Sequence, residues 1–396
     1  MNKKVSLGAA VSFTVIIAAI TFTLTMFFAK DIFNRKVANL AEREAVYAKI
    51  SEIDKIVRDK YTGEINEDDL LNAIAKGYVQ GLGDKYAAFF TPEELKAFSE
   101  SNEGVLEGIG VSASQDESGY IRIREIYKDS PAEQMKLQVD DLIIKVGDQD
   151  VKATGYSESV ELLKGDAGTK VKITYRRGAT DQTVELTRKK LTVQSIYYRM
   201  IGENGYIKIT DFNEATIKQF NNAIKDLTKQ NAKALIFDLR NNGGGTLDSV
   251  TSMLDTLLPE GVIATQTDNS GKTTVLGKSD ADEVKLPMVC LTNGGTASAS
   301  ELFVAALKDY DKTKVVGLNT YGKGVLQHTF NLKDGSALKL TTAKFNPPKS
   351  ANFDGVGIKP DYEVKLTAEQ ERNFDSLDET TDPQLKKAIE VANASR

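Results

Sequence analysis

Two apolar segments, each followed by glycines and then by a helical pattern, constrain the fold of this chain more than any other feature. Ala234–Arg240 runs into Asn-Asn-Gly-Gly-Gly and a predicted helix from Thr246 to Leu258. Met288–Leu291 leads through two glycines into a predicted helix from about Ala297 to Lys308. Strand–helix–strand order favours parallel strand pairing with right-handed crossovers. The sequence therefore predicts an α/β unit.

The rest of the chain divides by pattern into segments of different character. Residues 37–103 carry apolar side chains at helical spacing, whereas Tyr120–Ile126 alternates in the manner of a half-buried strand. The predicted organisation is a membrane anchor (1–36), a helical N-terminal region (37–103), a small β-rich domain (104–190), the α/β core (191–366) and a C-terminal helical tail (367–396).

The N-terminus carries a membrane signal. Lys3 and Lys4 precede an uncharged stretch from Val5 to Ala29. About 25 helical residues at about 1.5 Å each span a bilayer core of about 30 Å, and a cleaved signal has a shorter apolar core of about 7–15 residues. We expect an uncleaved, single-pass anchor in the cell membrane, with the body of the chain outside the cytoplasm. A cleaved signal sequence is the alternative.

The composition excludes several kinds of site. The chain has one cysteine, Cys290, and one histidine, His328, so it has no disulfide framework and no multi-histidine or cysteine-rich metal centre. A net charge of -5 with mixed signs disfavours nucleic acid as a partner. Cys290 is expected in a buried strand. His328 follows Gln327 on an alternating strand, so it should face the other way and be structural. No metal or cofactor is predicted.

A serine and a lysine are candidates for nucleophilic chemistry. Gly294–Glu301 places Ser298 at a helix N-terminus, where free N–H groups favour a developing oxyanion; the alternative is that its serines only cap the helix. Lys323 lies between glycines before an apolar strand. A desolvated lysine can lose its proton near neutral pH and then act as a base, although most lysines in turns are simply exposed.

The glycine turn Asn242–Gly245 is a third element. It follows the Ala234–Arg240 strand, and sites in open α/β sheets form outside such strand ends. A glycine N–H there can approach a substrate carbonyl, and a second donor can follow Ser298. The turn alone is weak support for a site.

Together these motifs resemble the C-terminal processing (tail-specific) peptidases. Gly-Thr-Ala-Ser-Ala-Ser-Glu is similar to the family's Gly-Ser-Ala-Ser-Ala-Ser-Glu, and Asp-Leu-Arg-Asn-Asn-Gly-Gly-Gly to its Asp-Leu-Arg-x-Asn-x-Gly-Gly. The spacing from Ser298 to Lys323, 323 − 298 = 25, also matches, as does Gln327 four residues later. The resemblance extends from about residue 40 to residue 390.

The resemblance implies a serine endopeptidase that cleaves protein substrates near their C-termini. It implies a crotonase-like (ClpP/crotonase) peptidase core with an inserted PDZ domain that recognises the substrate's free C-terminus and gates activity. The implied site consists of the nucleophile Ser298, the base Lys323, its orienting residue Gln327, oxyanion donors at the N–H groups of Gly244 and Ala299, and a carboxylate-binding loop of Gly108, Ile109, Gly110 and Val111. Lys164 departs from the family by replacing its usual arginine.

The resemblance also implies partners, and two other functions compete with it. Relatives dimerise through the helical region, so a homodimer through residues 37–103 is expected. A catalytically inactive PDZ adaptor that binds C-terminal tails is the main alternative. Gly317–Gly324 nearly matches a phosphate-binding loop, but Gly324 replaces the Ser/Thr that would hold magnesium, and a strand is expected to follow.

Overall fold

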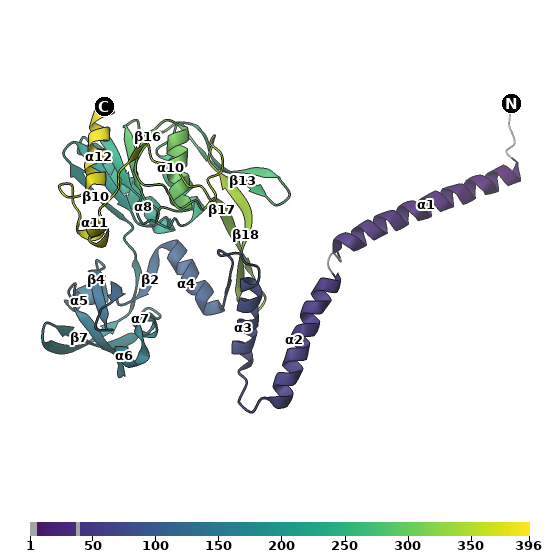
Figure 1. Cartoon of the computed structure of the whole chain (residues 1–396), viewed down its shortest axis with the longest axis horizontal. Coiled ribbons are helices and arrows are strands. Elements are labelled where there is room, and N and C mark those ends of the chain that lie inside the picture. The colour runs from purple at the N-terminus through teal and green to yellow at the C-terminus, as the bar shows by residue number, and fades with distance from the viewer. Residues whose placement is uncertain (1–5, 37–39) are drawn as a thin grey trace. The chain divides into compact units, whose positions relative to one another are not determined.

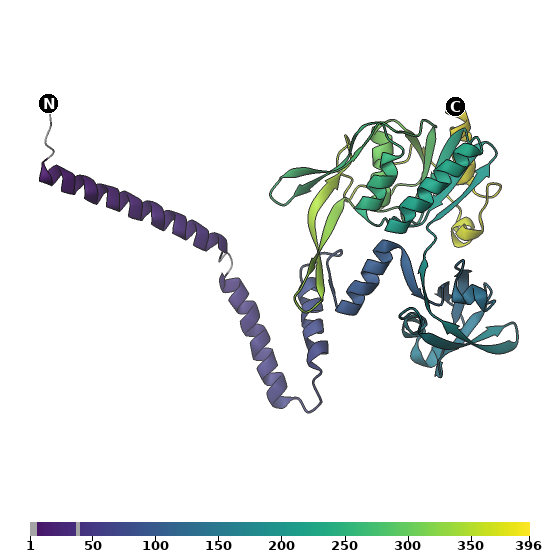
Figure 2. The same cartoon turned by 180° about the vertical axis from the view of Figure 1, so that it is seen from behind.

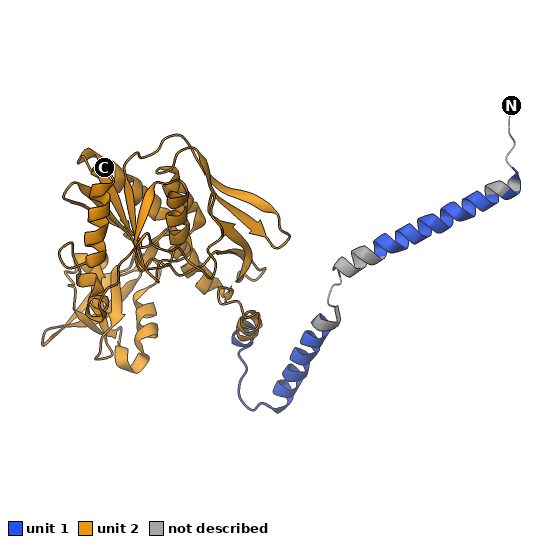
Figure 3. Cartoon of the chain, turned by 45° about the horizontal axis from the view of Figure 1, so that its top comes forward, with its two compact units in different colours: residues 1–71 blue, residues 72–396 orange. Residues whose placement is uncertain are grey.

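The computed structural model describes residues 6–36 and 40–396, so Lys3, Lys4 and Val5 of the predicted anchor lie outside the described residues. The chain has two compact units, residues 1–71 and 72–396 (Figure 3). The first contains α1 (Leu7–Lys36), α2 (Leu40–Lys60) and the start of α3 (Glu67–Gln80). Within α1, Val11–Ala29 has a mean hydropathy of 2.2 and is exposed along its length. By length and composition this helix suits either a membrane span or a signal sequence.

A six-stranded sheet forms the centre of the second unit. Its order is β10-β11-β12-β15-β16-β19, and all neighbours pair in parallel except the edge pair β10 and β11. The predicted parallel pairing is therefore confirmed. The strands are β10 (Ile196–Ile201), β11 (Asn204–Ile209), β12 (Ala234–Asp238), β15 (Met288–Thr292), β16 (Thr313–Gly317) and β19 (Tyr362–Glu363).

Helices cover both faces of this sheet (Figures 1 and 2). Because strand side chains alternate, Leu235 and Phe237 pack into one core and Ala234 and Ile236 into another. The first core includes residues of α8 (Glu214–Lys229), α9 (Leu247–Asp255) and α10 (Ala299–Asp309), and the second includes residues of α12 (Pro383–Ala394). Cys290 is buried in β15, as predicted.

An antiparallel sheet lies beside this core and carries the segment after Lys323. Its path is β1-β18-β13-β14, with β17 paired to β18. The strands are β1 (Ala88–Phe90), β13 (Gly261–Asp268), β14 (Thr273–Ser279), β17 (Val325–Asn331) and β18 (Ala337–Asn346). A strand rather than a helix follows Gly324, so the near match to a phosphate-binding loop lacks its helix.

Residues 105–192 form a separate β-rich body with its own apolar core, which includes Ile121, Ile123 and Ile143. Its main sheet runs β3-β4-β5-β7-β8, with β6 paired to β5, so β3 is an edge strand. The strands are β2 (Val105–Gly108), β3 (Val111–Gln115), β4 (Ile121–Ile126), β5 (Leu142–Val146), β6 (Gln149–Asp150), β7 (Lys170–Arg177), β8 (Thr180–Thr187) and β9 (Lys189–Thr192).

The remaining helices are short. They are α4 (Pro92–Glu103), α5 (Pro131–Gln134), α6 (Val151–Thr154), α7 (Tyr156–Leu163) and α11 (Ala368–Arg372), with one 3-10 turn at Phe374–Ser376. At the start of α4, Thr91 and Glu94 form a capping box.

Candidate active site

Ser298 occupies the turn between β15 and α10. Its backbone has φ 58° and ψ -117°, which an L-residue rarely adopts, so the turn is strained. A serine at such a strand-to-helix turn presents its hydroxyl at the end of the sheet. The next N–H, that of Ala299, begins the helix and lacks an intrahelical partner, as first-turn N–H groups do.

The glycine turn predicted to supply an oxyanion donor lies against this serine. Gly244 has φ 110°, and a methyl group added there would meet Ser298 Cβ at 2.9 Å and the Ala299 nitrogen at 3.0 Å. Only glycine permits so close an approach. In this structure the Gly244 N–H donates to Asn242 Oδ1 at 2.8 Å. The two predicted oxyanion donors are therefore neighbours, and one of them has an internal acceptor.

A buried carboxylate joins the serine turn to the lysine turn. Glu301 has no exposed surface. Its Oε2 accepts the N–H of Ser298 at 2.9 Å and the N–H of Lys323 at 2.8 Å. Its Oε1 accepts the N–H of Gly322 at 2.7 Å and the Thr320 hydroxyl at 2.5 Å. One side chain thus fixes the backbones of both predicted reactive residues.

The Lys323 side chain is half-buried at the start of β17. Its amine lies 4.6 Å from the centre of the Tyr86 ring. Burial lowers the pKa of this amine, and the charge of Lys339 lowers it further, while Tyr321, Asp84 and Glu301 act in the opposite direction. Within the described residues, no hydrogen bond joins Lys323 Nζ to Ser298 Oγ. The structure brings the two turns together without joining the two reactive atoms.

Gln327 and His328 lie on β17, one after the other. Gln327 Nε2 donates to Thr341 Oγ1 at 3.1 Å and to the Val325 carbonyl at 3.4 Å, and among the described residues no hydrogen bond joins its side chain to Lys323. His328 is exposed and its Nδ1 contacts Thr342 Oγ1. The proposed orienting role of Gln327 stays a prediction, and His328 lies in a different environment, as expected from strand alternation.

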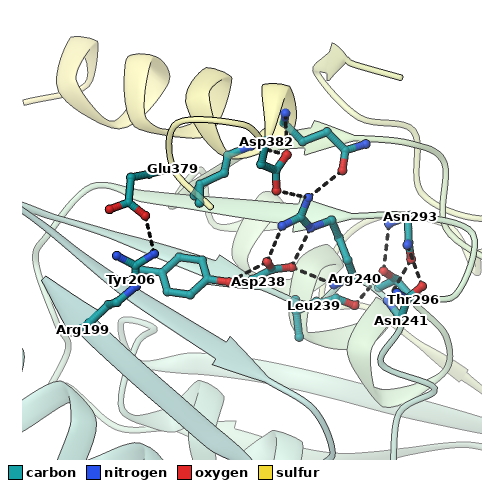
Figure 4. A network of polar contacts seen from close by, with 12 residues as sticks. Arg199, Tyr206, Asp238, Leu239, Arg240, Asn241, Asn293, Thr296, Glu379 and Asp382 are labelled. Atoms are coloured by element: carbon teal, nitrogen blue, oxygen red, sulfur yellow. Dashed lines mark hydrogen bonds and ion pairs between the residues drawn. The ribbon is translucent and has the colours of Figure 1, made fainter. Parts of the chain in front are cut away.

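A buried network of ion pairs lies at the end of β12, just before the glycine turn (Figure 4). The Arg240 guanidinium donates to both oxygens of Asp238, at 2.9 and 2.6 Å, and lies 2.7 Å from Asp382 at the start of α12. Burial raises the pKa of the Asp238 carboxyl, but the charge of Arg240 more than offsets it and holds that pKa below its usual range. Because the network includes α12, it ties the tail to the turn after β12.

The predicted carboxylate-binding loop joins β2 to β3 in the β-rich body. Gly110 has φ 81°, and a methyl group there would collide with the side chains of Ser130 and Leu191. A cavity of about 80 Å³ is lined by residues of this loop, of β3 and of α7, among them Ile109, Val111 and Leu163. An edge strand with an apolar cavity beside it has the form of a site for an added peptide strand.

Several residues at the site were not predicted from the sequence. The contacts of Tyr86 with Lys323 and of Asp382 with Arg240 join segments far apart in the chain. Tyr86 ends the run Gly-Leu-Gly-Asp-Lys-Tyr, and nothing in that run indicates a contact with Lys323. Among the described residues, no group of three His, Cys, Asp or Glu side chains has the arrangement of a metal site.

Comparison with known proteins identifies the family of this chain. The pattern of peptidase family S41 matches residues 203–364, and that of PDZ domains matches residues 122–177. A "Probable CtpA-like serine protease" of Staphylococcus aureus is 34% identical over 378 residues, which are 94% of this chain and 76% of that protein. One from Staphylococcus saprophyticus is 34% identical over 328 residues, covering 82% and 67%.

A solved structure agrees in fold. An S41 protease from Bacteroides fragilis is 17% identical, with a TM-score of 0.54, covering 86% of this chain and 94% of that one. The chain belongs to the CtpA-like serine proteases of peptidase family S41 and contains a PDZ domain. It is therefore a serine-type peptidase, a hydrolase. This class disfavours the inactive adaptor.

Proposed function

We propose that this peptidase cleaves protein substrates near their C-termini through an acyl-enzyme formed on Ser298, with Lys323 as general base. The observation that carries the proposal is the position of the Glu301 carboxylate. One of its two oxygens, Oε2, accepts hydrogen bonds from the backbone N–H groups of both Ser298 and Lys323. Two backbones held by one atom support a geometry in which the Lys323 amine can move to Ser298. Burial lowers the pKa of Lys323, which favours the neutral amine that a base requires.

The proposed reaction has two steps. The Lys323 amine takes the Ser298 proton as Oγ attacks the peptide carbonyl, and the N–H groups of Gly244 and Ala299 stabilise the oxyanion. For this, the Gly244 N–H must turn from Asn242 to the substrate. The lysine then gives its proton to the leaving amine, and water releases the acyl group. Gln327 is proposed to orient the amine once it leaves Thr341.

We further propose that the PDZ domain selects and admits the substrate. The C-terminal carboxylate would meet the loop Gly108, Ile109, Gly110 and Val111, and the tail would add as a strand to β3. A cavity of about 580 Å³ is lined by residues of α4, such as Lys96, by PDZ residues, including Lys164, and by Asp211 and Asn213 of the core. Asp211 lies beside the glycine turn, because a methyl group added at Gly245 would be 2.9 Å from Asp211 Oδ1.

The wider setting of the enzyme is also a proposal. The helix α1 is proposed as an uncleaved anchor with the catalytic body outside the cytoplasm, and residues 37–103 as a region for homodimerisation. We likewise propose that the peptidase core is crotonase-like. The proposed boundaries are 104–190 for the PDZ domain, 191–366 for the core and 367–396 for the tail.

Paired active-site variants test this function. The full chain in detergent is incubated with a protein substrate, and new C-termini are identified by mass spectrometry. Ser298→Ala and Lys323→Ala should each abolish cleavage, while Ser298→Ala still binds a C-terminal peptide. Cleavage by the Ser298→Ala variant at the wild-type rate would refute the mechanism.

A further inference from the structure

The amine of Lys323 lies in an aromatic and cationic cluster that the proposed reaction does not use. We define the aromatic cluster as the rings of Tyr86 and Tyr321 with the amines of Lys85 and Lys323. Lys85 Nζ lies 4.8 Å from the Tyr86 ring centre and 4.9 Å from that of Tyr321, and it donates to the Tyr321 hydroxyl at 2.9 Å. Lys323 Nζ lies 4.6 Å from the Tyr86 ring centre.

Sheet register brings this distant tyrosine to the lysine. Tyr86 stands two residues before Ala88, which pairs with Lys339 of β18. Tyr86 lies in the turn before β1, in which the Ala87 N–H donates to the Asp84 carbonyl. Asp84 of this turn lies against Thr341, the residue that pairs with Gln327 of β17. The strand β18 therefore lies between β1, which follows Tyr86, and β17, which follows Lys323.

The ring is the principal partner of the amine in this structure. Within residues 6–36 and 40–396, Lys323 Nζ has no hydrogen bond and no ion pair. The Gln327 amide, the other group proposed to hold the amine, donates to Thr341 instead. An ammonium over an aromatic face is stabilised by the ring quadrupole, whereas a neutral amine is not.

We propose that Tyr86 is a positioning residue that holds the protonated amine of Lys323 in a resting place. The amine must release its extra proton to solvent and leave this place before it can accept the Ser298 proton. This inference rests on the serine–lysine mechanism proposed above. Tyr86 thus competes with Ser298 for the base, and the resting enzyme is held partly inactive by a contact outside the peptidase turns. Binding of substrate against the aromatic cluster would release the amine.

The charges that face the amine set the direction of the effect. Asp84, Glu301 and Tyr321 favour the ammonium, whereas burial and Lys339 oppose it. Lys85 is a second cation that contacts the Tyr86 ring. Burial raises the pKa of the Tyr86 phenol, which favours its neutral form, and the inference concerns the ring rather than the hydroxyl. Removing the ring removes one stabiliser of the charged amine and leaves the others.

The test measures how fast Ser298 is labelled by a small fluorophosphonate at a series of pH values, with the full chain in detergent. Oγ attacks phosphorus, fluoride leaves, and the hydroxyl proton passes to the base, so the rate follows neutral Lys323. In Tyr86→Leu, loss of the cation–π contact should move the midpoint of the rate profile to lower pH by about one unit. Below that midpoint, labelling should be about tenfold faster than in the wild type.

Three further variants fix the interpretation. Tyr86→Phe keeps the ring and should keep the wild-type midpoint, whereas Tyr86→Trp, with the strongest ring for a cation, should move it to higher pH. Tyr310→Leu is a matched control, because Lys349 Nζ lies 4.7 Å from the Tyr310 ring away from the site, and it should leave the midpoint unchanged. Opposite shifts in the Leu and Trp variants cannot come from a shared folding defect.

The outcomes separate this inference from the proposed function. If Lys323→Ala abolishes labelling but Tyr86→Leu keeps the wild-type midpoint, the resting contact is refuted and the mechanism stands. If Lys323→Ala is labelled with the wild-type pH dependence, Lys323 is not the base and both fail. A midpoint that rises in Tyr86→Leu would also overturn the inference.

Discussion

The Glu301 carboxylate is the most sensitive point of the site, and Glu301→Gln is the sharpest way to perturb it. The substitution keeps the size and shape of the side chain but replaces one oxygen by an amide NH₂. Four donors converge on the carboxylate, three of them backbone N–H groups. The amide offers one oxygen, so the four donors cannot all be satisfied.

The loss can be estimated from the geometry. In the least costly orientation of the new amide, its NH₂ points toward Thr320, whose hydroxyl can rotate and accept. The Gly322 N–H, which donates to the same position, is then left without an acceptor. One orphaned buried N–H costs about 1–3 kcal/mol, and each remaining bond weakens when its acceptor loses charge. We expect a total of about 2–5 kcal/mol in the free energy of unfolding, a large part of a typical stability of about 5–15 kcal/mol.

Urea unfolding of the full chain in detergent measures this loss. The chain has 14 tyrosines and no tryptophan, so tyrosine fluorescence with circular dichroism is the suitable signal. Glu94→Gln is the matched control, because Glu94 occupies the same position in the capping box of α4 but its side chain is 44% exposed. Labelling of Ser298 should fall in Glu301→Gln alone. Wild-type stability and labelling in that variant would refute the reasoning.

Three other perturbations have defined outcomes. Arg240→Met should lower the free energy of unfolding by about 3–5 kcal/mol because it leaves Asp238 and Asp382 without their buried cation, while Arg176→Met in an exposed pair should change the melting temperature little. Gly110→Ala should abolish binding of a C-terminal peptide, measured by fluorescence anisotropy, yet spare labelling of Ser298 by a small probe. Peptidase activity should rise with pH, because deprotonation of Lys323 creates the base. It should reach its plateau at a pH below the usual lysine pKa of about 10.4, because burial lowers the pKa of Lys323. A flat pH profile would contradict this expectation.

Local patterns predicted the parts of the fold that local physics decides. The continuous apolar runs of β12 and β15 and their glycine turns predicted the parallel strands and the helices after them. The helical tail predicted within residues 367–396 contains α12 (Pro383–Ala394), where a proline follows the capping Asp382. The hairpin β13–β14 was not predicted. Its strands are rich in threonine and partly exposed, so they lack the alternation that marks a half-buried strand.

The site was predictable only as far as its motifs reach. Spacing within the chain indicated Ser298 and Lys323, since each follows a glycine turn with its own signature. It gave no information on where the lysine amine points, because that depends on Tyr86, more than two hundred residues earlier in the chain. The partner of Arg240 in the tail was hidden for the same reason. Contacts between distant segments are set by packing, which no local pattern reports.

The site combines a fixed frame with reactive groups that each contact another partner. Glu301 fixes the serine and lysine turns, and Arg240 fixes the strand end that precedes the glycine turn, through buried charge-assisted bonds. The three groups that must act on a substrate each have another partner: the Lys323 amine has the Tyr86 ring, the Gln327 amide has Thr341, and the Gly244 N–H has Asn242. Each of these contacts would have to be exchanged for a substrate contact, and neither Glu301 nor Arg240 takes part in any of them. This arrangement fits the gating by substrate tails proposed above, because activation would then require local exchanges of partners and no rebuilding of the fold.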